Sequence, residues 1–163
     1  MKQASRQVGL LVAAAFSSNV LAITPCISED FSAVPTRYSI DYSEIQAIYG
    51  ARCSGCHIGG ASGGLSLATM VSFANTVNVN SSNANAASVR VRPFDPVNSF
   101  LFKKVNCTNV NSIAGMPFGL RMPRNGPPFL SLQNQALLFD WISLGAPVTA
   151  SDRLFISRFD GRF

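Results

Sequence analysis

Five consecutive residues constrain this chain more than any other feature of its sequence: Cys53, Ser54, Gly55, Cys56 and His57. Cysteines at this spacing place both sulfur atoms on one side of a single helical turn. The imidazole of His57 follows at once, and the two residues between the sulfurs are small. The pentapeptide therefore predicts a site for thiol, metal or porphyrin chemistry.

The three kinds of site differ in what the rest of the sequence must supply. A thiol oxidoreductase motif normally follows a strand of a βαβ unit, whereas residues 41–52 have a helical pattern. A structural zinc site needs four ligands, usually from two clusters, but His57 is the chain's one histidine and the other cysteines stand alone. The pattern is the attachment signature of a covalent haem, in which Cys53 and Cys56 form thioethers and His57 binds the iron. We expect one covalently bound haem (heme c) here.

The first 22 residues have the layout of a secretory signal peptide. Lys2 and Arg6 precede an apolar run at residues 8–16, and small residues lead to Ala22, after which we expect cleavage. The run is too short to span a bilayer, so the mature chain is predicted to lack a transmembrane segment. These features predict a periplasmic or secreted protein, with an uncleaved anchor as the alternative.

An oxidising compartment bears on the two cysteines outside the pentapeptide. Cys26 and Cys107 are the cysteines not assigned to the haem, and a disulfide between them would tie the mature N-terminus to the middle of the domain. Neither their spacing nor their surroundings fixes the geometry, so two free buried thiols are the alternative.

The charge of the chain does not indicate a nucleic-acid partner. The formal net charge is +5, and removal of Lys2 and Arg6 leaves 11 basic against 8 acidic side chains, or +3. The basic residues are scattered, and no run is longer than Lys103-Lys104. With 163 residues, of which 47% are hydrophobic, the chain can form one domain with a core.

An amphipathic helix is predicted at residues 42–52, directly before the haem motif. Asp41 is a suitable N-cap, and Glu44 three residues later completes a capping box. An apolar face recurs at helical spacing and consists of Tyr42, Ile45, Ile48, Tyr49 and Cys53. After the motif, residues 59–64 are too glycine-rich for regular structure and could turn closely around a flat cofactor or form a surface loop.

Three further helices are predicted downstream. The first spans residues 65–77, with an inward face of Leu67, Met70, Val71 and Ala74. The second begins with Asp95 as N-cap and Pro96 at its first position, and buries Val97, Phe100, Leu101 and Val105. The last spans residues 132–144, between Ser131 as N-cap and Gly145, with an apolar face of Leu137, Leu138, Trp141 and Ile142.

The second axial ligand cannot be a histidine, because the chain has only one. A methionine thioether is the usual partner opposite histidine. Met122 lies in a loop stiffened by prolines, Met116 precedes Pro117 in a weaker version of that context, and Met70 falls in a predicted helix core. We expect Met122 to bind the iron, with Met116 next; a lysine, a terminal amine and an open position are the alternatives.

These motifs resemble the class I, single-haem c-type cytochromes over roughly residues 40–147. The matching residues are Cys53-x-x-Cys56-His57, Gly64-Leu65-Ser66-Leu67, Asp95-Pro96-x-Asn98-Ser99-x-Leu101, Met122-Pro123-x-x-Gly126 and Trp141-Ile142-x-x-Gly145-Ala146. The resemblance implies an all-α cytochrome c fold with irregular loops around the haem. It also implies that the first and last helices cross, here through Tyr49 and the Leu138/Trp141 face, and that His57 and Met122 are the axial ligands.

The expected organisation and function follow from this resemblance. The chain would comprise a signal peptide (1–22), an N-terminal arm (23–38), a cytochrome c domain (39–147) and a C-terminal tail (148–163) that packs on the domain or docks a partner. The domain would carry one electron between redox partner proteins, alone or as a subunit of an oxidoreductase. No nucleophile–base set is evident, so we expect no catalysis by the polypeptide. The alternative is a ligand-binding or sensing haem protein with an open sixth position.

Overall fold

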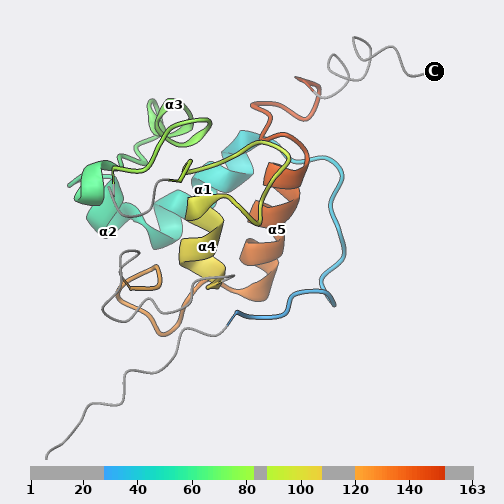
Figure 1. Ribbon diagram of the computed structural model, residues 1–163, viewed down its shortest axis with the longest axis horizontal. Coiled ribbons are helices and arrows are strands. Elements are labelled where there is room, and N and C mark those ends of the chain that lie inside the picture. Colours follow the sequence, from blue (N-terminus) through green and yellow to red (C-terminus); the bar gives the residue numbers. More distant parts are fainter. Residues whose placement is uncertain (1–27, 83–87, 108–119, 153–163) are drawn as a thin grey trace, which may run out of the picture.

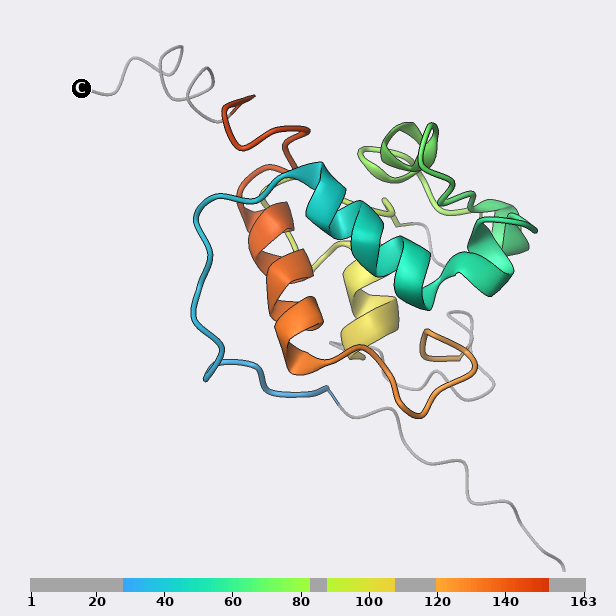
Figure 2. The ribbon, with the colours of Figure 1, turned by 180° about the vertical axis from the view of Figure 1, so that it is seen from behind.

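The computed structural model describes residues 28–82, 88–107 and 120–152. Regular structure in these residues is helical: α1 (Tyr42–Arg52), α2 (Ser54–His57), a 3-10 turn η1 (Ser62–Gly64), α3 (Ser72–Thr76), α4 (Phe100–Asn106) and α5 (Leu132–Ser143). The described residues also form two isolated β-bridges, between Val77 and Val91 and between Asn80 and Val89. Figures 1 and 2 show α4 beside α5, with α1 packed against α5 and α2 at the opposite end of α1.

Helix α1 forms as its sequence predicts. Asp41 and Glu44 make the capping box, in which the Asp41 backbone N–H donates to the Glu44 carboxylate at 3.3 Å. The predicted apolar face is buried at Tyr42, Ile45, Ile48 and Tyr49. The chain after α5 also fastens this end of the helix, because the N–H of Tyr42 donates to the carbonyl of Val148 at 3.0 Å.

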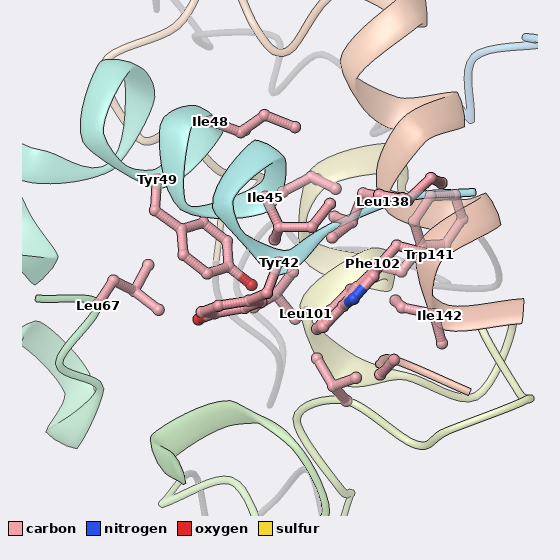
Figure 3. Packing of buried hydrophobic residues seen from close by; sticks show 14 of the residues in the cluster. Tyr42, Ile45, Ile48, Tyr49, Leu67, Leu101, Phe102, Leu138, Trp141 and Ile142 are labelled. Atoms are coloured by element: carbon pink, nitrogen blue, oxygen red, sulfur yellow. The ribbon is translucent and has the colours of Figure 1, made fainter. Parts of the chain in front are cut away.

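Helix α5 is confirmed with its predicted cap, since Ser131 Oγ accepts from the N–H of Asn134 at 3.2 Å. Its indole ring contacts α1, but through a different tyrosine from the one expected. The ring centroids of Trp141 and Tyr42 lie 5.5 Å apart. The ring of Tyr49 lies on the other side of Tyr42, with its centroid 6.4 Å from that of Tyr42 (Figure 3). The helices therefore meet at the start of α1, where Tyr42 fills the space beside Trp141.

The prediction of a helix at residues 65–77 is wrong over most of that range. Only α3 is helical, and Met70 is 93% exposed, with Val71 and Ala74 exposed as well; Leu67 is buried as expected. Ser72 and Thr76 face inward instead, because the Tyr42 hydroxyl donates to Ser72 Oγ at 2.7 Å and Thr76 Oγ1 donates to the Ser72 carbonyl at 2.8 Å. Satisfied hydroxyl groups can be buried at little cost, which the apolar pattern alone does not reveal.

Helix α4 starts later than predicted, with Ser99 as its N-cap. The carboxylate of Asp95 closes a turn by accepting from the N–H and the side-chain amide of Asn98, at 3.2 and 3.0 Å. Pro96 and Val97 therefore precede the helix, and Val97 is exposed rather than buried. The other predicted positions, Phe100, Leu101 and Val105, are buried, together with Phe102.

The described part of the N-terminal arm packs on the helices. Phe31 contacts Phe102 of α4 and Phe139 of α5, with ring centroids 5.9 and 5.3 Å apart, and the N–H of Arg37 donates to Asp140 at 2.7 Å. Each of these contacts bridges the arm to a residue far along the sequence. The arm is therefore packed on the helices at Phe31 and Arg37.

Several predictions fall outside the described residues: the signal peptide, Cys26, Met116 and the tail from residue 153. Cys107, at the end of α4, is disulfide-bonded, while Cys53 and Cys56 are free thiols. Cys26 is the remaining cysteine of the sequence, but it lies outside the described residues. Its pairing with Cys107 therefore stays a prediction. Among the described helices, none has the length and apolar composition needed to cross a membrane.

Candidate functional site

The pentapeptide forms a helical turn of its own directly after α1. The N–H of Cys53 still donates to Tyr49 of α1 at 2.9 Å, and the N–H of His57 donates to the Cys53 carbonyl at 2.9 Å. Cys53 is partly buried and Cys56 is exposed, and both thiols are free. The residues that carry the two sulfur atoms and the imidazole therefore lie in one helical turn of the backbone.

His57 is oriented by the glycine-rich segment that follows it. Its Nδ1 lies 3.1 Å from the carbonyl oxygen of Leu65. A carbonyl can only accept, so this contact places the proton on Nδ1 and leaves the lone pair of Nε2 for a metal ion. A second bond, from the N–H of Leu67 to the His57 carbonyl at 2.7 Å, holds the same segment against the motif.

The reversal of the chain between His57 and Leu65 depends on left-handed backbone conformations. Ala61, Gly63 and Gly64 have φ values of 43°, 63° and 68°. Glycine adopts such values without steric cost, so Gly63 and Gly64 help the chain to bring the Leu65 carbonyl back to the imidazole. The sequence predicts no regular structure at residues 59–64, whereas Ser62–Gly64 form the 3-10 turn η1. The segment brings the carbonyl of Leu65 to His57 Nδ1.

A buried arginine holds the far side of this turn. Arg90 Nη2 donates to the Gly64 carbonyl at 2.9 Å, and Nη1 donates to the Asn75 carbonyl at 2.7 Å. Burial lowers the pKa of the Arg90 guanidinium. The ion pairs found among the described residues do not include Arg90, so it is a buried cation held by neutral carbonyls. Such a group favours a bound anion close to the His57 turn.

Met122 lies in the loop between α4 and α5, where it is partly buried against the core. Its N–H donates to the Lys104 carbonyl at 2.8 Å. The loop is also tied to the end of α1, because Arg52 Nη2 donates to the Phe129 carbonyl at 3.3 Å and to that of Pro128. In both Figure 1 and Figure 2 the loop lies on the side of the molecule where α1 meets α2.

The environment of the Cys53 thiol does not favour thiol redox chemistry. Burial raises the pKa of the Cys53 thiol to about 11, an effect only partly opposed by Arg52. Redox-active Cys-x-x-Cys motifs have lowered thiol pKa values, because the thiolate is the nucleophile. The described residues contain no group of three or more His, Cys, Asp or Glu arranged to hold a metal ion.

We expect Cys56 to react with iodoacetamide much faster than Cys53 in haem-free protein at pH 8. Cys56 is exposed, whereas Cys53 is partly buried and its pKa of about 11 leaves about one thiolate in a thousand thiols at that pH. Mass spectrometry of the alkylated peptides measures the ratio. Equal rates, or a faster Cys53, would contradict the described burial and reopen the thiol oxidoreductase hypothesis.

Some residues around the site could not be identified from the sequence. Arg90 donates to a backbone carbonyl of the glycine turn, and Arg52 donates to backbone carbonyls of the Met122 loop. Contacts with backbone carbonyls leave no signal in the sequence. The nearby Arg121 is one of several scattered basic residues, and only its position beside Met122 could have singled it out. Comparison of the chain with protein-family models, curated proteins and solved structures gave no match.

Proposed function

We propose that this chain is an exported mono-haem c-type cytochrome that carries one electron between partner proteins. The observation that carries the proposal is the hydrogen bond between His57 Nδ1 and the Leu65 carbonyl, which leaves Nε2 available next to two free thiols in the same turn. A haem bound there would supply a one-electron Fe(II)/Fe(III) couple.

The residues of the site fit this group. Cys53 and Cys56 would hold the porphyrin edge by thioethers, and His57 would bind the iron from one side. Met122 would supply a second ligand, from a loop whose backbone is held by Lys104 and Arg52. Arg90, a buried cation near the turn, suits a haem carboxylate. These roles involve binding and orientation, so the polypeptide itself needs no catalytic residue.

The two axial ligands together would set the properties of a carrier. With His57 and Met122 both as ligands, a bound haem would supply a one-electron couple that needs little rearrangement of these residues, and the thioether would favour the ferrous form. If Met122 were not bound, the sixth position would be open, and the domain would instead bind or sense a small gas ligand. The state of Met122 is therefore what separates the two functions.

A redox titration of the haem-loaded chain in the presence and absence of carbon monoxide tests the proposal. A carrier should titrate reversibly with a one-electron slope, and its reduced form should take up carbon monoxide slowly. Rapid uptake would favour the sensing function instead. A chain without haem absorption but with a reducible Cys53–Cys56 disulfide would be a thiol oxidoreductase.

A further inference from the structure

The N-terminal arm reaches the segment that carries Met122 through a cluster at the C-terminal end of α4, formed by Glu29, Asn106, Arg121 and Gln135. The Glu29 carboxylate accepts from Arg121 Nη2 at 2.5 Å and also from the amide of Gln135. The Arg121 side chain is 12% exposed, so this ion pair is largely shielded from water on the arginine side. Arg121 directly precedes Met122 in the chain.

Two buried amides complete the cluster. Asn106 Nδ2 donates to the Glu29 carbonyl at 2.9 Å and to Gln135 Oε1 at 2.6 Å. Gln135 is fully buried, and its Nε2 also donates to the carbonyl of Leu130, at the end of the Met122 loop, at 2.8 Å. Glu29 thus contacts residues of α4, of α5 and of the loop between them.

The backbone of the loop is fixed to α4 at the same place. The last carbonyls of a helix have no partner within the helix. Here the carbonyl of Val105 accepts from Arg121 Nε at 3.0 Å, and that of Lys104 accepts from the N–H of Met122 at 2.8 Å. The guanidinium of Arg121 also lies 4.2 Å from the centre of the Phe129 ring, within the same loop.

The planar guanidinium of Arg121 therefore has three kinds of contact at once: a carboxylate, a helix carbonyl and an aromatic face. Charge-assisted hydrogen bonds to a carboxylate are the strongest of these and fix direction as well as distance. Without Glu29, the shielded cation of Arg121 would lose its counter-charge and would favour rotation toward water. That rotation would release the Val105 carbonyl and the adjoining N–H of Met122.

We propose that Glu29 is a positioning residue for Met122: through Arg121 it fixes the loop backbone from which the methionine sulfur reaches the iron. This inference rests on the proposed function. It assigns a role to the arm, whose residue Glu29 contacts the loop that carries Met122. Glu29 does not touch the iron ligand, and its effect is transmitted by the Arg121 side chain.

The test compares three variants of the full chain: Glu29→Ala, the near-isosteric Glu29→Gln, and Asp30→Ala as the matched control. Asp30 is the neighbouring carboxylate, and it is exposed and accepts from the N–H of Ser32. Two quantities are measured, the hydrogen exchange of the Met122 amide and the rate at which reduced, haem-loaded protein binds carbon monoxide. The reduction potential serves as a third.

We expect Glu29→Ala to raise both rates about tenfold, which corresponds to about 1.4 kcal/mol of lost anchoring, and to lower the potential. Glu29→Gln should recover part of this loss, because one acceptor oxygen remains for Arg121, and Asp30→Ala should change nothing. Unchanged rates in haem-loaded Glu29→Ala, or equal changes in Asp30→Ala, would overturn this proposal alone. A wild-type chain that holds no haem would overturn the proposed function and this proposal with it.

Discussion

Replacement of both Cys53 and Cys56 by alanine is expected to abolish covalent haem completely. The two sulfur atoms are the only groups in the helical turn of the motif that can form thioethers, and both are free. The measurement is a haem stain of the denatured protein on a gel, after expression in a host that matures c-type cytochromes. We expect no stain from the double variant at a level of protein that stains strongly in the wild type.

The matched control for this experiment is Ser54→Ala, which changes an exposed residue between the two cysteines. This variant should retain the haem stain, because a side chain at that position contributes no sulfur. A stain that persisted in the double cysteine variant would show that the haem is attached elsewhere. A stain lost in Ser54→Ala would show that the method responds to any change in the motif.

Met122→Ala is expected to leave the haem attached but to open the sixth position of the iron. Loss of the thioether removes the ligand that favours the ferrous form, so the potential should fall, by on the order of 0.2 V within the range of about 0.8 V that axial ligands set. Carbon monoxide should then bind the reduced protein rapidly. The weak sulfur-to-iron charge-transfer band of the oxidised protein should disappear.

Two other methionines provide the comparisons for this prediction. Met70 is 93% exposed, so Met70→Ala should retain the band and the potential. Met116, which lies outside the described residues, is the alternative ligand. A band unchanged in Met122→Ala but lost in Met116→Ala would assign the ligand to Met116. It would also contradict the positioning role proposed for Glu29 and Arg121.

The elements that could be predicted from sequence are those with local signals. Helix α1 has a capping box and a regular apolar face, and α5 has the Ser131 cap; both formed within one residue of the predicted limits. The buried face of α3 and the start of α4 could not be predicted, because they depend on side-chain hydrogen bonds. The Tyr42 hydroxyl buries Ser72, and the Asp95 carboxylate closes a turn where a helix was expected.

The residues of the candidate site also differ in how far they could be predicted from local sequence signals. Cys53, Cys56 and His57 are contiguous, so their grouping follows from the sequence, and the glycines after them predict the turn. The partners that orient these residues are distant or use the backbone: Leu65 binds His57 through its carbonyl, and Glu29 is 92 residues from Arg121. No spacing rule connects such pairs, which form only once the helices have packed.

The central claim is that the Cys53–His57 turn holds a covalent haem, and the most direct test is an absorption spectrum of the purified full chain before and after denaturation. The chain is produced in a host that matures c-type cytochromes, denatured, and separated from small molecules. The account predicts a strong Soret band that stays with the denatured polypeptide. A chain without a Soret band, or a band that leaves with the small molecules on denaturation, would contradict it.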